Sequence, residues 1–375
     1  MLSYWEKTQL LNYDLIVLGG GITGMFCALE YRKLNPKASV AILERGLFSN
    51  GASTKNAGFA CFGSLTELMD DSKNMDNQSL CKIVQMRIDG LALLRETLGD
   101  KNIDLKWNGG YELFFDKTPD ALNQIDHFNE LLKPIFKKKV FYLNNSKIEQ
   151  FGFAADRVKH IIENPFEGQI DTGMMMRALR SIVNQKDISF FSNVTLTDFD
   201  FSKDQNHLTL SLKNIDFNLN CKNLAVCNNA FASQLFPSLK ISPGRGLVIL
   251  TEPIPNLKLE GTFHYQQGYY YFRNIKDRIL LGGGRSVDFD TESTSSFGVN
   301  PKNKNQLIED LQNFIFPSEK VSLDMEWSGI MAFGKDKMPI VKKHQNNIVI
   351  GVKLSGMGIA IGSEVGKKLA MLLEN

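Results

Sequence analysis

A glycine-rich turn close to the N-terminus constrains the fold of this chain more than any other feature. The apolar run Asp14–Leu18 is typical of a buried parallel strand, and the pattern G-x-G-x-x-G follows it directly at residues 19–24. A helix-compatible stretch comes next, and a second apolar run, Ser39–Leu43, closes a βαβ unit of about thirty residues. In this context the three glycines serve a tight turn, a close approach of backbone to a pyrophosphate, and helix–strand packing. The unit therefore predicts a dinucleotide site.

The residues after this unit narrow the choice of dinucleotide. Glu44 ends the second strand, where a carboxylate accepts hydrogen bonds from both ribose hydroxyls and repels a 2′-phosphate, which disfavours NADP. Two stretches rich in small residues, 51–58 and 351–358, would let backbone pass over a pyrophosphate or a flat ring system. The chain holds no second G-x-G-x-x-G pattern, so we do not expect a flavin reductase fed by a nicotinamide nucleotide.

Composition and charge exclude several classes of protein. The chain has 375 residues, of which 43% are hydrophobic and 22% charged, as in globular rather than disordered proteins. Lys and Arg number 43 and Asp and Glu number 41, and the resulting net charge of +2 argues against a dedicated nucleic-acid binder. No apolar run reaches the length of about 18 residues that indicates a membrane span. The first residues also lack the apolar core of a signal peptide.

The cysteines and histidines point to no metal site. The five cysteines are scattered and no pair has C-x-x-C spacing, so the sequence contains neither a zinc ribbon nor a dithiol redox motif. The five histidines show no helical pairing and no Ser/His/Asp grouping. We therefore expect a soluble, reduced, cytoplasmic protein whose chemistry is carried by a cofactor.

The remaining periodicity predicts local elements. We expect 62–100, 119–132 and 171–183 to be helical, with Asp171 or Thr172 as the cap of the last. Residues 290–305 are rich in Ser, Thr and Asn and predict a loop, and the final helix is expected from about Ser363. Strands are expected at 111–115, 189–194, 208–212, 223–227, 246–251, 268–273, 278–282 and 348–352.

Together these motifs resemble one family, the D-amino-acid oxidase and dehydrogenase superfamily, which includes glycine oxidase and sarcosine oxidase. The resemblance rests on the glycine pattern at 19–24, Glu44-Arg45, the stretch Gly51-x-Ser53-x-x-Asn56-Ala57-Gly58 and the glycine-rich tail. It extends from Asp14 to the end of the chain. Its middle is supported by Ile170-Asp171-Thr172, by Leu224–Ala230, and by the strands Gly268–Arg273 and Arg278–Gly284.

The resemblance implies an α/β fold with two domains. A discontinuous Rossmann-type FAD-binding domain would carry an inserted α+β substrate domain built on a mainly antiparallel sheet. We expect residues 14–65, 150–235 and 325–375 in the FAD-binding domain, and residues 85–149 and 240–324 in the substrate domain. Residues 1–13 would be a lead-in without clear strand or helix period.

The cofactor implied by the resemblance is FAD, bound non-covalently. Cys61 lies near the predicted ring site, but the position at which sarcosine oxidase carries its flavin-linked cysteine is not a cysteine here. The residues assigned to FAD are Gly19, Gly21, Ile22, Thr23, Gly24, Glu44, Arg45, Ser53, Lys55, Asn56, Ala57, Gly58, Val194, Asn228, Ala230, Gly329, Ser355, Gly356, Met357, Gly358 and Ile359.

The chemistry implied by the resemblance is removal of a hydride from the carbon next to an amine nitrogen, giving an imine that water hydrolyses. The substrate would be a small amine or amino acid, and O2 or an electron-transfer partner would reoxidise the flavin. The chain departs from the family at Trp327–Phe333, where Met331 occupies the position of an arginine that binds the substrate carboxylate. Either the substrate lacks that carboxylate or another cation binds it.

Three arginines are candidates for this role, Arg273, Arg285 and Arg245, in that order of preference. Arg273, Arg285 and Tyr270, from the tyrosine run of the substrate-domain sheet, are assigned to the catalytic site. Two alternatives remain open at this stage. The flavin could serve modification of a macromolecule such as tRNA, which the near-neutral charge weakens. Alternatively, the chain could bind FAD without amine turnover, with Met331 as the supporting feature.

Overall fold

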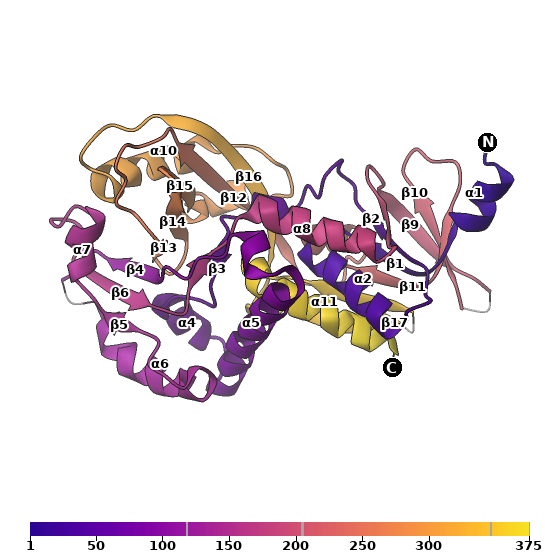
Figure 1. Cartoon of the computed structure of the whole chain (residues 1–375), viewed down its shortest axis with the longest axis horizontal. Coiled ribbons are helices and arrows are strands. Elements are labelled where there is room, and N and C mark those ends of the chain that lie inside the picture. The colour runs from indigo at the N-terminus through magenta and orange to yellow at the C-terminus, as the bar shows by residue number, and fades with distance from the viewer. Residues whose placement is uncertain (118, 204–205, 346, 375) are drawn as a thin grey trace.

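The computed structural model of the chain describes residues 1–117, 119–203, 206–345 and 347–374. Its strands form two large sheets, one toward each end of an elongated molecule (Figure 1). Helices cover the region in which the two sheets approach each other (Figure 1). The α/β class predicted from the sequence is therefore confirmed.

The first sheet is built around the predicted βαβ unit. β1 (Asn12–Leu18) and β2 (Val40–Leu43) pair in parallel, and α2 (Ile22–Leu34) connects them. The remaining strands of this sheet are β8 (Ser189–Phe191), β9 (Leu196–Phe201), β10 (Leu208–Leu212), β11 (Leu219–Val226), β17 (Ile340–Gln345) and β18 (Ile348–Val352). The order is β17-β18-β11-β1-β2-β8, with β10 paired to β11 and to β9. β1 is thus central, and its residues 15–17 are fully buried.

The second sheet is mainly antiparallel, as predicted. Its order is β16-β12-β15-β14-β13-β4-β6-β5, in which only β13 and β4 pair in parallel among the described strands. The bounds are β4 (Gly110–Phe114), β5 (Tyr142–Leu143), β6 (His160–Asn164), β12 (Ser242–Thr251), β13 (Thr262–Tyr265), β14 (Tyr270–Ile275), β15 (Arg278–Gly283) and β16 (Leu323–Phe333). A short antiparallel ribbon of β3 (Phe59–Ala60) and β7 (Gly168–Gln169) forms the third sheet.

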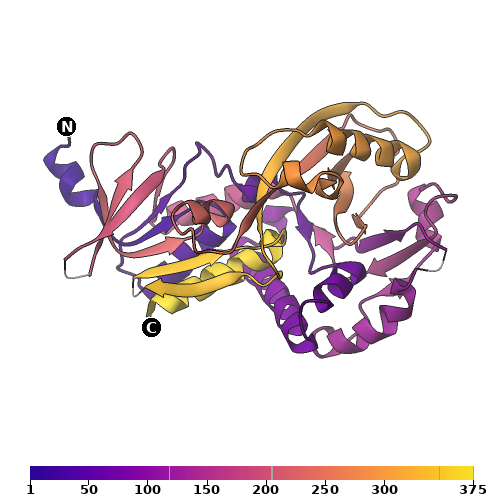
Figure 2. The ribbon, with the colours of Figure 1, turned by 180° about the vertical axis from the view of Figure 1, so that it is seen from behind.

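Helices flank both sheets. Their bounds are α1 (Tyr4–Gln9), α3 (Ala52–Lys55), α4 (Leu65–Ser72), α5 (Asn77–Leu98), α6 (Ala121–Phe136), α7 (Ser146–Phe151), α8 (Thr172–Gln185), α9 (Phe289–Glu292), α10 (Pro301–Asp310) and α11 (Gly358–Glu374), with short turns at Asp100–Ile103, Asn229–Gln234, Arg285–Val287 and Leu311–Ile315. α11 packs against α2 and α5, and Figure 2 shows it beside β17 and β18 in yellow. Gly366 lets α11 approach α2 closely, since a Cβ at this position would lie only 2.7 Å from the Cys27 backbone nitrogen.

Several local predictions are corrected by the structure. The lead-in contains α1, whose first turn is closed by a capping box between Ser3 and Glu6. The expected loop at 290–305 contains most of α9 and the start of α10, where Asn300 caps the helix and Pro301 occupies its first turn. The last helix begins at Gly358 rather than near Ser363. The starts of α1, α9 and α10 depend on capping residues, which the spacing of hydrophobic residues does not indicate. Asp171 does cap α8, as predicted, by accepting from the Met174 N–H.

Sheet membership bears on the proposed domain boundaries. β6 lies within 150–235 and the larger part of β16 lies within 325–375, both expected in the FAD-binding domain, yet both strands pair in the second sheet. We therefore propose that the substrate domain also includes these two strands.

Among the described residues, no helix combines the length and apolar character that a bilayer-spanning segment needs.

Candidate active site

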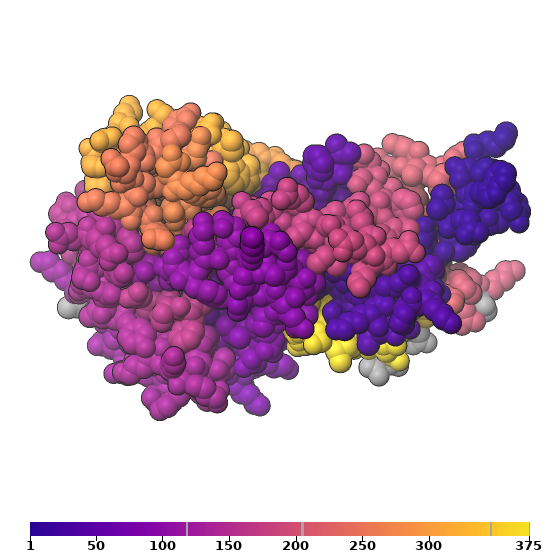
Figure 3. Space-filling model, in the orientation of Figure 1, coloured from indigo at the N-terminus to yellow at the C-terminus, as the bar shows by residue number. Residues whose placement is uncertain are grey.

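One large cavity, of about 720 Å³, lies where the two sheets meet. It is lined by the ends of β1, β2 and β11 on one side and by β12, β14, β15 and β16 of the second sheet on the other. Ligands of open α/β sheets bind at the carboxyl ends of the strands, and cofactor cavities measure roughly 300–1,000 Å³. On the face seen in Figure 3, α5 and α8 pack together over the junction between the sheets.

The predicted glycine turn forms one wall of this cavity. A Cβ on Gly21 would lie 2.7 Å from the Ser53 hydroxyl, and that hydroxyl accepts from the Ile22 N–H at 3.0 Å. Gly24 does not line the cavity. A Cβ there would lie 1.9 Å from the Gly19 carbonyl oxygen, so the third glycine allows α2 to pack against the turn. The turn therefore leaves the start of α2 open to a ligand.

Glu44 is held in place at the edge of the cavity. Its buried carboxylate accepts from the Gly20 N–H at 3.0 Å and from the Gly46 N–H at 2.9 Å. Nearby, the Arg45 guanidinium stacks over the Phe231 ring at 3.5 Å from the centroid. Each carboxylate oxygen retains a further lone pair for a hydroxyl donor.

Unpartnered polar atoms show that this half of the cavity fits a polar ligand. Thr23 Oγ1, Asn228 Oδ1 and Ser355 Oγ are buried, have no hydrogen-bond partner among the described residues, and belong to residues that line the cavity. Buried polar atoms are nearly always satisfied in folded proteins, so orphaned ones at a cavity wall indicate a bound group. The ribityl and pyrophosphate oxygens of FAD supply such partners.

The assigned FAD residues converge on this cavity from seven separate segments of the chain. All of them line it except Gly24, whose role is packing, and Ala230, which is buried beside it. The neighbouring Asn229 lines the cavity instead, and its side chain accepts from the Lys353 N–H at 3.0 Å.

The tyrosine assignment is corrected by the strand register. Side chains alternate along β14, and it is Tyr271, with Tyr269 just before the strand, that faces the cavity. The Tyr270 ring is 3% exposed and stacks on Tyr265 in the opposite core, at 4.7 Å between ring centroids. Burial raises the pKa of Tyr271 to about 12, so its hydroxyl remains a hydrogen-bond donor at neutral pH. We therefore replace Tyr270 by Tyr271 in the candidate site.

Two of the three candidate arginines do not reach the cavity. Arg273 is buried beneath Gly58, where its Nη2 would lie 3.0 Å from an added Cβ. Burial, opposed by Asp171 and Asp104, lowers the pKa of Arg273 to about 10, so it stays charged in the protein interior at neutral pH. Arg245 forms a two-point ion pair with the Glu292 carboxylate at 2.8 and 3.1 Å. The first preference, Arg273, is thus corrected.

Arg285 is the candidate that faces the cavity. Its guanidinium carbon lies 3.6 Å from the centroid of the Phe333 ring, and burial lowers the pKa of the group. No described residue forms a hydrogen bond or ion pair with it. A Cβ on Gly244 would lie 2.4 Å from Arg285 Nη1, and Gly244 is directly opposite Met331 in the β12–β16 register. Gly244 therefore lets the Arg285 side chain lie across β12, close to Met331, the residue that replaces the arginine expected from the family.

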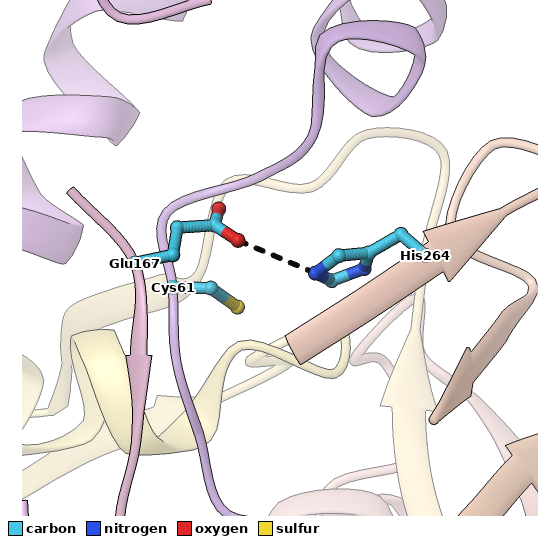
Figure 4. Close-up of side chains that lie close together, drawn as sticks. All are labelled: Cys61, Glu167 and His264. Atoms are coloured by element: carbon cyan, nitrogen blue, oxygen red, sulfur yellow. Dashed lines mark ion pairs between the residues drawn. The ribbon is translucent and has the colours of Figure 1, made fainter. Parts of the chain in front are cut away.

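A buried acid–base cluster lies beside the end of the cavity that carries Tyr271, since the Phe59 ring packs edge-on against both His264 and Tyr271. His264 Nδ1 is 3.8 Å from Glu67 Oε2, and His264 Nε2 is 3.4 Å from Glu167 Oε2. Burial alone would lower the pKa of His264, but the carboxylates of Glu167 and Glu67 outweigh it and raise the pKa to about 9. Burial raises the pKa of the neighbouring Cys61 thiol. Figure 4 shows Cys61, Glu167 and His264 with their polar ends turned toward one another. The sequence carries no spacing pattern for this cluster, because its three members come from distant parts of the chain.

Residues 14–372 match the sequence profile of the DAO family, described as FAD dependent oxidoreductase. The chain belongs to this family. FAD is therefore its cofactor and oxidation–reduction its chemistry, which confirms the resemblance, the cofactor and the enzyme class expected from the sequence. A search of curated proteins finds no match.

Solved structures show the same fold over nearly the whole chain. Glycine oxidase from Geobacillus kaustophilus has 20% sequence identity and a TM-score of 0.77, covering 97% of this chain and 95% of that chain. L-proline dehydrogenase from P. horikoshii has 16% identity and a TM-score of 0.77, over 97% and 93%. Iminodiacetate oxidase from Chelativorans sp. BNC1 has 16% identity and a TM-score of 0.75, over 96% and 95%. At these identities the likeness establishes the fold alone.

Proposed function

We propose that this FAD-dependent oxidoreductase removes a hydride from the α-carbon of a small α-amino acid, giving an imino acid that water hydrolyses. The observation that carries the proposal is the partly buried Arg285 guanidinium, which faces the cavity and forms no ion pair or hydrogen bond with a described residue. Glu292 acts on its charge without forming an ion pair with it, because the Glu292 carboxylate is bound by Arg245. Planar guanidinium groups bind carboxylates through two parallel hydrogen bonds. The missing anion is then the carboxylate of the substrate.

The neighbouring residues shape the space around that carboxylate. The Tyr271 ring packs edge-on against Phe59, with centroids 5.7 Å apart, and its hydroxyl lies 4.0 Å from a Cβ placed on Gly246. Met331 approaches the same glycine, with its Cε 2.9 Å from that position. These groups form a mixed polar and apolar wall beside Arg285. We propose that Arg285 binds the carboxylate and Tyr271 donates to the substrate.

The protein's contribution to the reaction is orientation. Bound FAD supplies the hydride acceptor. The chain's own residues hold the substrate's carboxylate and side chain, so that only the α-carbon is presented to the ring, and such positioning accounts for a large share of rate enhancement in enzymes. The predicted FAD residues that line the cavity remain our assignment for the cofactor site.

The test is anaerobic bleaching of the flavin absorbance by two pools of compounds. One pool contains α-amino acids, and the other contains matched amines without a carboxylate. We expect bleaching by the first pool, weakened in Arg285→Met and retained in Arg278→Met, because Arg278 is paired with Asp324 outside the cavity. Bleaching by the amine pool alone would overturn the proposed role of Arg285. Absence of bleaching by either pool, in a yellow protein, would overturn the small-molecule proposal and favour a macromolecular substrate or a flavoprotein without turnover.

Three finer assignments accompany this proposal. We propose non-covalent FAD, because the sequence lacks the family's flavin-linked cysteine. We propose a cytoplasmic location, which the five free cysteines support. We also propose a small-molecule acceptor or an electron-transfer partner for reoxidation, which hydrogen peroxide production in air would distinguish, and we expect no nucleic-acid partner at a net charge of +2.

A further inference from the structure

We propose that Cys61, Glu167 and His264 form a site for one divalent metal ion of the zinc type, beside the substrate end of the FAD cavity. One donor atom from each residue lies within 4.8 Å of the other two. All three side chains are more than nine-tenths buried. The inference is independent of the proposed substrate, because it concerns a second group next to the cavity.

The fold brings the three residues together from distant parts of the sequence. Phe59 pairs with Gln169 and Ala60 with Gly168 in the antiparallel ribbon β3–β7, so the next step of the register places Cys61 beside Glu167. His264 enters from β13 of the second sheet. Figure 4 shows the imidazole and the carboxylate aimed at each other, with the sulfur next to the gap between them.

Unsatisfied donor atoms indicate that a ligand is missing from this cluster. His264 Nε2 forms an ion pair with Glu167 Oε2 at 3.4 Å, but among the described residues neither this nitrogen nor Glu167 Oε1 has a partner in hydrogen-bond geometry. A tetrahedral zinc ion bound at 2.0–2.3 Å holds its donor atoms roughly 3.5 Å apart. The observed separations therefore require only small side-chain movements to close around an ion, which would partner both orphaned atoms.

The donor types and their surroundings favour zinc. Thiolate, imidazole and carboxylate are its usual ligands, and the thiol proton is released when the metal binds. Glu67 Oε2 lies 3.8 Å from the other ring nitrogen, Nδ1, and is itself held by the Ser64 N–H at 3.0 Å. A carboxylate behind a metal-bound histidine orients the ring in many zinc sites. Cys61 and His264 also line the FAD cavity, so the fourth coordination position faces it.

The test measures metal and flavin, not turnover. The full-length holoenzyme, purified without metal-chelate resin, is incubated with Zn²⁺, dialysed, and analysed for zinc by mass spectrometry and for FAD by absorbance. We expect about one zinc per chain, with X-ray absorption showing a single sulfur ligand at about 2.3 Å. Replacing zinc by Co²⁺ should give visible d–d absorption at wavelengths beyond the flavin bands.

Two ligand variants and one matched control make the assignment specific. Cys61→Ser and Glu167→Gln should lose the metal and keep FAD, whereas Cys81→Ser, which changes a cysteine on α5 outside the cluster, should keep both. A wild-type chain that retains less than about a tenth of an equivalent of zinc and takes up no cobalt would overturn the proposal. The three residues would then form a buried ion-pair cluster without a metal. Zinc that persists in Cys61→Ser would equally overturn it. If Glu167→Gln fails to fold, the cobalt spectrum of wild type against Cys61→Ser still decides.

Discussion

The substitution Arg285→Met tests the proposed carboxylate site most directly. Arg285 is partly buried and forms no ion pair with a described residue, so we expect it to form one only when a substrate carboxylate binds. Truncating one member of a buried hydrogen-bonded charge pair costs about 2–5 kcal/mol. Because Arg285 is only partly buried, we take about 3 kcal/mol, which corresponds to a loss of roughly 100-fold in kcat/KM for an α-amino acid.

The same substitution should leave folding nearly unchanged. It removes a partly desolvated charge that forms no ion pair within the described part of the chain, which favours the folded state. It also removes the stacking of the guanidinium on Phe333, at 3.6 Å, which contributes about 0.5–1 kcal/mol. These effects oppose each other, so we expect the free energy of unfolding to change by less than about 1 kcal/mol. The FAD content should stay at the wild-type level.

The assay is anaerobic stopped-flow reduction of the flavin, with an α-amino acid and with the matched amine lacking the carboxylate. The expected result is a large rise in the apparent Kd for the amino acid and little change for the amine. Arg278→Met is the matched control, because that arginine pairs with Asp324 outside the cavity. A loss of less than roughly threefold, or about 0.7 kcal/mol, would refute the reasoning. An equal loss of kcat/KM with the amine would show that Arg285 does not bind the substrate carboxylate.

Three further predictions concern the cofactor and the cavity. Gly21→Val should abolish FAD retention, because the valine side chain would fill the space in which the pyrophosphate approaches the backbone of the glycine turn. Its Cβ alone would lie 2.7 Å from Ser53 Oγ. A purified variant with full flavin absorbance would contradict the assignment. Acid precipitation should release all the FAD into the supernatant, and yellow precipitated protein would instead indicate a covalent bond. Burial raises the pKa of Tyr271 to about 12, so its proton is lost only as the pH approaches that value. Tyr271→Phe should therefore lower the rate of flavin reduction about 5–10-fold, because one hydrogen bond to the substrate is lost. The dependence of this rate on pH should stay unchanged below about pH 11. A shift in that dependence would show that the Tyr271 hydroxyl loses its proton at a lower pH.

The nucleotide half of the fold was predictable because its signals are local. β1, the glycine turn and α2 follow one another in the chain, so an apolar run, three glycines and helix-compatible residues are enough to indicate them. The helix cap at Asp171 is local in the same sense. Missed elements such as β6 and β17 are short strands whose apolar pattern is weak or interrupted, and pairing with neighbouring strands rather than propensity makes them strands.

The substrate half was less predictable because its signals depend on register. The period of two along residues 269–272 was evident, but Tyr270 was assigned to the cavity side and the structure places Tyr271 there. A strand's alternation is the same for both choices, and only the pairing of β14 with β13 and β15 selects one. The choice among the arginines depends on tertiary contacts in the same way, since only the fold pairs Arg245 with Glu292.

The amino-acid sequence by itself determined the glycine turn, the acidic residue Glu44 at the end of the second strand and the family to which the chain belongs. Those features lie in continuous segments, so their residue types and spacing already define the geometry. The tertiary structure alone decided which tyrosine and which arginine face the cavity, and it brought Cys61, Glu167 and His264 together. Such contacts join residues far apart in the chain, and they exist only after sheet register and packing have set which side of each strand is buried.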